Sequence, residues 1–337
     1  MNIAIIYHDA DFDGKLSNEV CRHWLKKLHP KATIHSYGWD YGRPVNPPYD
    51  WPNVSHDIAP VDWFDYDSIY IVDLSVDELM SRPKLRDKIA WIDHHKSAIE
   101  KWDKLADIGD KPYPYFQGYR IDGVAACRLC WQWFYTQQLD AQDGGEGRFT
   151  LPVKQHYIDR AVSEPKLLTL AGEYDIWDHR DPDAKALQFG LRALSDNNYR
   201  ILVESQFSAN DGAGYGSTPL VAVIANGYAI KSYCDRQNDE YSASYSHTIK
   251  WEGLTFCALN IGQRGNSDLL RGGIKPEHEA LFAWRFDGKS VMVSLYHAPG
   301  QEHRDLSIIA TKHGGGGHRG ACGFRISLTQ LNEIIGK

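Results

Sequence analysis

Three apolar runs of the chain each end in side chains that bind metal ions, and this pattern constrains the fold most strongly. The run Ile89–Ile92 leads directly into Asp93, His94 and His95. Two earlier runs end in the same way: residues 3–7 precede His8, Asp11 and Asp13, and residues 69–72 precede Asp73. In an open α/β sheet, side chains that follow neighbouring parallel strands meet in one crevice. We therefore expect a dinuclear metal centre at the carboxyl edge of a parallel sheet.

The first cluster, formed by His8, Asp11 and Asp13, has a simpler explanation when it is taken alone. An acidic turn after a strand is a common surface loop. Beside Asp73 and Asp93–His95, however, the metal site is the favoured interpretation. Carboxylates with neutral imidazoles suit Mn²⁺ well, and Mg²⁺ is the alternative ion. Two ions roughly 3.5–4 Å apart can stabilise both the attacking and the leaving oxygen of a phosphoryl transfer.

A second acidic cluster follows the apolar run at residues 167–171. Glu173, Asp175 and Asp178 all lie close enough in sequence for one of them to be a further ligand, and the residues alone do not choose among them. The alternative is a solvated turn that Trp177 anchors in the core.

The third cluster is a glycine run between two histidines, His313 and His318. Glycines let backbone amides approach a ligand closely, and such loops can bind anions. A hinge is the alternative, but the flanking histidines favour a binding role. The residues expected to contact substrate are Gly315, Gly316, Gly317, His318 and Arg319.

The order of predicted elements favours an α/β fold with two parts. Strand–helix alternation predicts a doubly wound parallel sheet in the first part. We expect a catalytic domain over residues 1–200, a helical connector over 201–245, and a second, smaller α/β domain over 246–337. The net charge of −7 argues against a protein that binds long duplexes through a basic surface. No apolar stretch approaches the roughly 20 residues that span a bilayer. The six cysteines form no regular framework and no signal peptide precedes the first strand, so we expect a cytoplasmic protein.

These motifs resemble those of the DHH phosphoesterase superfamily, in its two-domain form with a DHH-associated C-terminal domain. Five stretches carry the resemblance in the expected order over nearly the whole chain: residues 7–14, 71–75, 92–98, 174–177 and 314–318. The resemblance implies a Mn²⁺-dependent phosphodiesterase or phosphatase that acts on nucleotide-type substrates.

The resemblance also implies a ligand set. One ion would be held by His8, Asp11 and Asp73, and the other by Asp13, Asp73, His94 and Asp175, with Asp73 bridging the two. His95 is similar to the family's second motif histidine near the scissile phosphate, and Asp93 is grouped with it as a catalytic candidate.

The sequence thus predicts a hydrolase of phosphodiester bonds in short single-stranded oligonucleotides, or in cyclic or linear dinucleotides. Two alternatives stay open. One is a phosphatase or pyrophosphatase of small phosphorylated metabolites, and the other is a catalytically silent nucleotide-binding sensor. We expect no membrane partner, and a homodimer is compatible with the sequence.

Overall fold

The computed structural model describes residues 1–40, 61–106, 116–142, 152–178, 180–208, 218–262 and 267–336. The chain divides into two compact units, Met1–Tyr228 and Ala229–Lys337. The division falls inside the long helix α9 (Thr218–Tyr245). The three-part division expected from the sequence stays a prediction.

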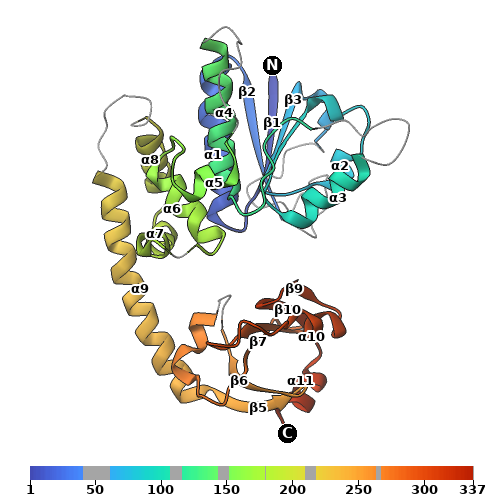
Figure 1. Cartoon of the computed structure of the whole chain (residues 1–337), viewed down its shortest axis with the longest axis vertical. Helices are drawn as coiled ribbons and strands as arrows, with labels where there is room; N and C mark the ends of the chain where they lie inside the picture. The colour runs from blue at the N-terminus through green and yellow to red at the C-terminus, as the bar shows by residue number, and fades with distance from the viewer. Residues whose placement is uncertain are drawn as a thin grey trace. The chain divides into compact units, whose positions relative to one another are not determined.

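The first unit is built on a four-stranded parallel sheet with the order β2-β1-β3-β4 (Figure 1). Its strands are short and rich in apolar residues such as isoleucine, as buried parallel strands usually are. Because all four run in the same direction, their carboxyl ends lie at one edge of the sheet. The strands are β1 (Asn2–His8), β2 (Thr33–Trp39), β3 (Ser68–Val72) and β4 (Ile89–Ile92).

Helices cover both faces of this sheet, which confirms the doubly wound architecture. Side chains of β1 alternate between the faces, so Ile3 and Ile5 join one core cluster while Ala4 and Ile6 join the other. The first cluster packs under α1 (Phe12–Leu28), α4 (Ala126–Gln142), α6 (Lys166–Asp175), α7 (Pro182–Arg192) and α8 (Asp196–Ser208). The second packs under α2 (Asp77–Met80) and α3 (Lys96–Ala106), which lie on the other side of the sheet in Figure 1.

Three short helical segments complete the described part of the first unit. They are η1 (Trp63–Asp65), η2 (Arg86–Lys88) and α5 (Lys154–Ile158). Beyond β4 the described residues of this unit form helices and loops and no further strand of the sheet, apart from isolated bridges in which Gln117 pairs with Ala90 and Arg120 with Asp93. All four strands of the first sheet therefore lie before Asp93.

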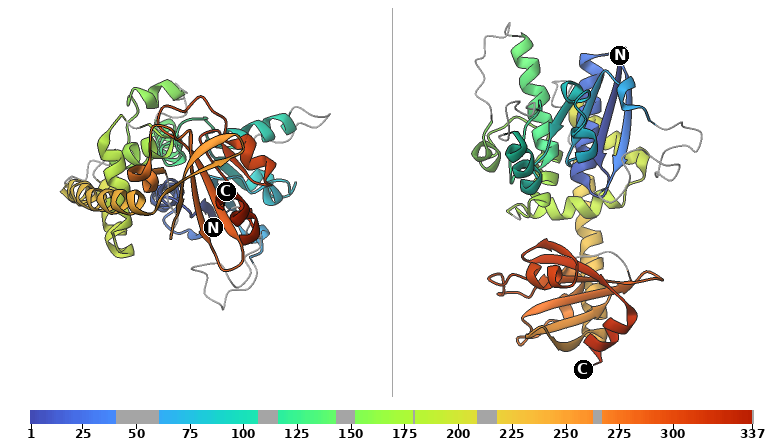
Figure 2. Two further views of the ribbon diagram at one scale, coloured as in Figure 1. Left: turned by 90° about the horizontal axis from the view of Figure 1, so that it is seen from below. Right: turned by 90° about the vertical axis from the view of Figure 1, so that its right-hand side faces the viewer.

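The second unit contains a six-stranded mixed sheet with the order β5-β6-β7-β8-β10-β9, seen as one twisted sheet in Figure 2. Only β6 and β7 are parallel neighbours. The strands are β5 (His247–Trp251), β6 (Leu254–Asn260), β7 (Ala280–Phe286), β8 (Val291–His297), β9 (Gly316–His318) and β10 (Ala321–Ile326). The helices are η4 (Ser267–Gly273), α10 (Ser307–Lys312) and α11 (Leu328–Ile335). This confirms the expected second α/β domain.

Among the residues that the structure describes, no helix is long and apolar enough to cross a membrane.

Candidate metal centre

The carboxyl edge of the first sheet carries the side chains that the sequence singled out. His8 is the last residue of β1, Asp73 follows β3, and Asp93 follows β4. These strands are hydrogen-bonded neighbours, so their ends are fixed relative to one another by the sheet.

The turn from β1 into α1 depends on a glycine. A Cβ at Gly14 would lie 1.9 Å from the carbonyl oxygen of His8, so only glycine lets α1 start against the end of β1. Asp11 caps this helix, because its Oδ1 accepts a hydrogen bond from the Gly14 amide at 3.2 Å. The cap leaves Oδ2 of Asp11 3.2 Å from Nδ1 of His8.

Asp13 is held by a second helix. Its two carboxylate oxygens accept hydrogen bonds from the amides of Ala126 and Cys127, each at 2.8 Å, at the start of α4. The side chain is buried, and Oδ2 also lies 3.6 Å from Nε2 of His94. The positive end of the α4 dipole thus stabilises a carboxylate that faces the centre.

Asp73 adopts a backbone conformation that is unfavourable for most residues. Its φ of 62° lies in the left-handed region, and its amide donates to the carbonyl of Ile92 at 2.9 Å. Such strain persists only where the surrounding structure imposes it. The residue is 1% exposed, and the Oδ1 of its side chain makes no hydrogen bond with any described residue.

The predicted ligands converge on Asp73 and His94. Oδ2 of Asp73 lies 3.5 Å from Nδ1 of His8, while Oδ1 lies 3.3 Å from Nε2 of His94. Nε2 of His94 is also 3.4 Å from Oδ2 of Asp175. Three overlapping groups have ligand atoms within 4.8 Å of one another: His8, Asp11 and Asp73; Asp13, His94 and Asp175; and Asp73, His94 and His95.

Buried carboxylates give this centre a strongly unbalanced charge. Burial raises the pKa of the Asp73 carboxyl well above its usual range, and the charge of Asp13 raises it further. The pKa of Asp175 is raised for the same two reasons. Burial alone would lower the pKa of His8, but hydrogen bonds to Asp11 and Asp73 outweigh it and raise that pKa to about 11. The acids therefore repel one another and attract positive charge.

Divalent cations fit this donor set. Carboxylate oxygens and imidazole nitrogens are ligands of Mn²⁺ and related ions, and the buried Oδ1 of Asp73 has no other hydrogen-bonding partner among the described residues. Cations would also neutralise the repulsion between the buried acids.

His95 lies beside this centre and is oriented by Asp93. Oδ1 of Asp93 accepts hydrogen bonds from the amides of His94 and His95, at 2.7 and 3.2 Å, and lies 2.7 Å from Nδ1 of His95. Asp93 is fully buried, whereas the His95 side chain is 37% exposed. Burial lowers the pKa of His95, but the Asp93 carboxylate outweighs it and leaves that pKa raised. Asp93 thus contacts His95 and the start of α3.

The structure brings only one acid of the second cluster to the centre. Glu173 is fully buried, but both of its oxygens are bound by Arg160, at 2.7 and 2.6 Å. Asp178 is bound by Arg180, at 2.9 and 2.8 Å. Asp175 alone lies near His94.

Asp40 was missed by the sequence reasoning. It directly follows β2, and its Oδ1 lies 3.4 Å from Nε2 of His8, on the other side of the ring from Asp11 and Asp73. The available signal was the alternation of side chains over residues 32–39, which is typical of a strand, because an acid after a parallel strand reaches the same edge as the other ligands.

The glycine run lies in the second unit and forms part of its sheet. Gly316–His318 is an exposed edge strand paired with β10, where a loop was expected. Gly314 and Gly317 have φ angles of 79° and 131°, whereas a Cβ at Gly316 would meet nothing within 4 Å. The run is anchored by His313, whose ring stacks on Phe324 with centroids 5.1 Å apart.

The two side chains expected to contact substrate beside this run, those of His318 and Arg319, are both exposed. Arg319 is largely exposed and lies 3.5 Å from Asp305, and it donates to the carbonyl of His303 at 3.1 Å. His318 is exposed at the end of β9.

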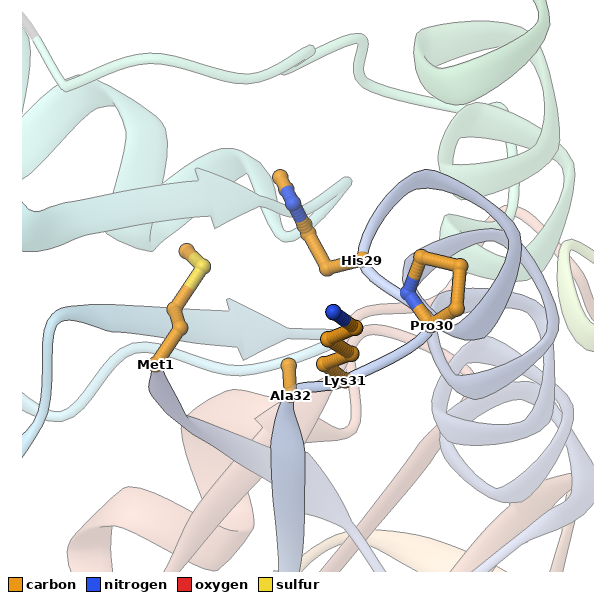
Figure 3. Close-up of a pocket in the computed structure, with 5 residues that line it drawn as sticks. All are labelled: Met1, His29, Pro30, Lys31 and Ala32. Carbon is orange, nitrogen blue, oxygen red and sulfur yellow. The ribbon is translucent and has the colours of Figure 1, made fainter.

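A cavity of about 310 Å³ elsewhere in the first unit is not this centre (Figure 3). It is lined by Met1, His29, Pro30, Lys31 and Ala32. Met1 precedes β1 and Ala32 precedes β2, so the cavity lies at the amino edge of the sheet.

No family model matches the sequence, and no curated protein matches it. Among solved structures, the DHH domain of a member of the s1p family of ribosomal proteins aligns with 99% of this chain and 85% of its own, with a TM-score of 0.55 and 13% identity. The fold of this chain is therefore similar to that of a DHH-domain protein over nearly its whole length.

Two further solved structures show weaker likenesses. A pGpG-specific phosphodiesterase from Vibrio cholerae aligns with 99% of this chain and 96% of its own, at 14% identity and a TM-score of 0.43. The exonuclease RecJ bound to manganese aligns with 98% and 87%, at 12% identity and a TM-score of 0.43. The likeness to the DHH-domain protein, at a TM-score of 0.55, supports the resemblance read from the sequence at the level of the fold.

Proposed function

We propose that this DHH-fold protein is a metal-dependent phosphoesterase whose preferred cofactor is a pair of Mn²⁺ ions. The observation that carries the proposal is the buried Asp73 carboxylate, which lies between His8 and His94 with one oxygen toward each. Three further acids surround it, namely Asp11, Asp13 and Asp175. A protein that only binds nucleotides has no need of so many acids at one point.

The proposed ligands are divided as the resemblance implied. His8, Asp11 and Asp73 would hold one ion, and Asp13, Asp73, His94 and Asp175 the other. When bound, these ions would supply positive charge for the phosphoryl oxygens and lower the pKa of water.

His95 is the proposed proton donor. Asp93 contacts Nδ1 of His95 and raises the pKa of the imidazole. The ring therefore stays protonated up to a higher pH than a free imidazole does. With Nδ1 occupied, Nε2 is the nitrogen that can protonate the leaving oxygen. Asp93 is then a positioning residue that fixes the ring, as the acid partner of a histidine commonly does.

The proposed substrates are short single-stranded oligonucleotides, or linear or cyclic dinucleotides. The pGpG activity named for one structural neighbour is consistent with this size. The exposed glycine strand and His318 are the proposed contacts for the rest of the substrate, together with Arg319.

A reducing compartment such as the cytoplasm is also proposed, because all six cysteines are free. The homodimer stays a prediction.

The test is product analysis with Mn²⁺ or Mg²⁺ on labelled dinucleotides, longer oligonucleotides, cyclic dinucleotides and pyrophosphate. We expect Mn²⁺-dependent release of mononucleotides from the short substrates. Turnover of pyrophosphate alone would favour the phosphatase alternative. Tight dinucleotide binding without turnover under any metal would favour the silent sensor.

A further inference from the structure

Trp177 is a large aromatic side chain held at the surface by an unusual backbone. It is 65% exposed, and its φ of 59° lies in the left-handed region. A tryptophan gains nothing from this conformation itself, which favours glycine or asparagine. A large apolar ring left exposed also forgoes the stabilisation that its burial would give. Strained residues of this kind cluster at ligand-binding sites.

The surrounding segment fixes this conformation on both sides. The amide of Ile176 donates to Gly172 at 3.3 Å, and the amide of Asp178 donates to Glu173 at 2.8 Å. Ile176 also packs against the core of the first unit, and Glu173 is fully buried. The ring of Trp177 is therefore presented on a rigid support.

This support is continuous with the metal centre. Trp177 follows Asp175 by two residues, and two residues span at most about 7 Å of chain. Asp175 itself lies 3.4 Å from His94, at Oδ2 and Nε2. In a nucleotide, one ribose separates the phosphate from the base. A phosphate at the centre would thus bring its base within reach of the Trp177 ring.

We propose that Trp177 is a stacking platform for the nucleobase attached to the scissile phosphate. The inference rests on the proposed function and narrows its substrates to phosphoesters that carry a base. Stacking on an aromatic face tolerates any base, because every base has a π face. Trp177 would then select nucleotides over pyrophosphate without selecting a sequence.

The test compares a dinucleotide with the same compound lacking the base beside the scissile phosphate. We expect Trp177→Ala to raise KM for the dinucleotide about tenfold, the size of one stacked base, and to change kcat by less than about twofold. On the abasic compound, Trp177→Ala should match the parent. Trp177→Phe should restore most of the dinucleotide KM, because a smaller ring still stacks. Phe64→Ala is the control, since Phe64 is a 45% exposed aromatic that lies before β3, away from the carboxyl edge.

A second variant separates recognition from structural support. Asparagine tolerates the left-handed backbone, so Trp177→Asn should keep or raise Tm while it weakens binding of a phosphorothioate dinucleotide. A structural role predicts the opposite, a lower Tm with unchanged binding. Equal binding by the parent, Trp177→Asn and Trp177→Ala would overturn the inference.

The two proposals fail differently. If the parent cleaves the dinucleotide and the abasic compound with equal KM, the phosphoesterase stands and the platform is wrong. If the parent neither cleaves nor binds the dinucleotide, both are wrong.

Discussion

Nε2 of His94 lies 3.3 Å from Oδ1 of Asp73, although the two residues follow different strands of the sheet. The Asp73 amide donates to the carbonyl of Ile92, so a backbone hydrogen bond ties the two strand ends together. The other oxygen of Asp73 faces His8 at 3.5 Å. One carboxylate thus lies between two imidazoles, which is the geometry that a bridging ligand requires.

The first prediction tests this bridge with Asp73→Asn. Asparagine matches the shape of the side chain and tolerates its φ of 62°. Turnover should fall to background, because a neutral amide cannot balance two cations. The metal-free variant should nevertheless be more stable than the parent, by about 1–4 kcal/mol, because a buried charge repelled by Asp13 is gone. Calorimetry with and without Mn²⁺ measures both effects. Near-parental activity in the folded variant would remove Asp73 from the site.

The second prediction concerns Asp40, which orients His8 from the side opposite the proposed ion. Acid partners of metal-binding histidines typically contribute 10–100-fold to metal affinity. Asp40→Asn should weaken Mn²⁺ binding by about tenfold, with little loss of stability, as isothermal titration would show. Asp67→Asn is the matched control, because Asp67 is an exposed acid that precedes β3 at the amino edge. Equal effects of the two variants would mean that Asp40 acts only through general charge.

The third prediction separates substrate contact from backbone requirement in the glycine run. A Cβ at Gly316 meets nothing within 4 Å, whereas at Gly317 it would lie 2.7 Å from Cα of Cys322 at a φ of 131°. Gly317→Ala should therefore destabilise the protein by about 1–3 kcal/mol. Gly316→Val should leave stability nearly unchanged and Mn²⁺ affinity unaffected, yet weaken binding of a nonhydrolysable dinucleotide. Unchanged dinucleotide binding by Gly316→Val would show that this edge strand does not contact substrate.

Much of the metal centre could be predicted because the strands and the ligands are adjacent in sequence. Apolar runs such as Ile89–Ile92 identify a buried strand, and the residues after it must appear at the carboxyl edge. His8, Asp73 and His94 were found in this way. The sequence could not show how their side chains are tied down. Asp13 caps α4, which starts 113 residues later, and no local pattern encodes a contact of that range.

Two other features could not be predicted because they depend on contacts that only the folded chain makes. The sequence alone does not show whether Glu173 or Asp175 is a metal ligand. In the structure Arg160 binds both oxygens of Glu173, whereas Asp175 lies near His94. The three residues of β9 have no alternation of side chains, so their pairing with β10 left no signal.

The last prediction tests the anchor of the glycine run through pH. Oε1 of Glu252 lies 3.0 Å from Nε2 of His313, and the carboxylate also accepts from Lys312 at 2.6 Å. Lys312 and His313 lower the pKa of Glu252. An acid whose pKa is lowered by folding stabilises the protein above its unfolded pKa, and this contribution is lost as the pH falls through the folded value.

Glu252→Gln should therefore lower Tm at pH 7. The difference from the parent should begin to shrink as the pH falls below about 4.3, the unfolded pKa of a glutamate, and should vanish only below the lowered pKa of the folded protein. Because the ion pairs of Glu252 with Lys312 and His313 are well solvated, the loss of stability at pH 7 should not exceed about 1 kcal/mol. Hydrogen exchange at the Gly315 amide, which donates to Ala310 at 2.9 Å, reports on the run directly and should quicken in the variant. Glu240→Gln on the exposed surface of α9 is the control. A Tm difference as large at pH 3 as at pH 7 would show that Glu252 acts through packing and not through its charge.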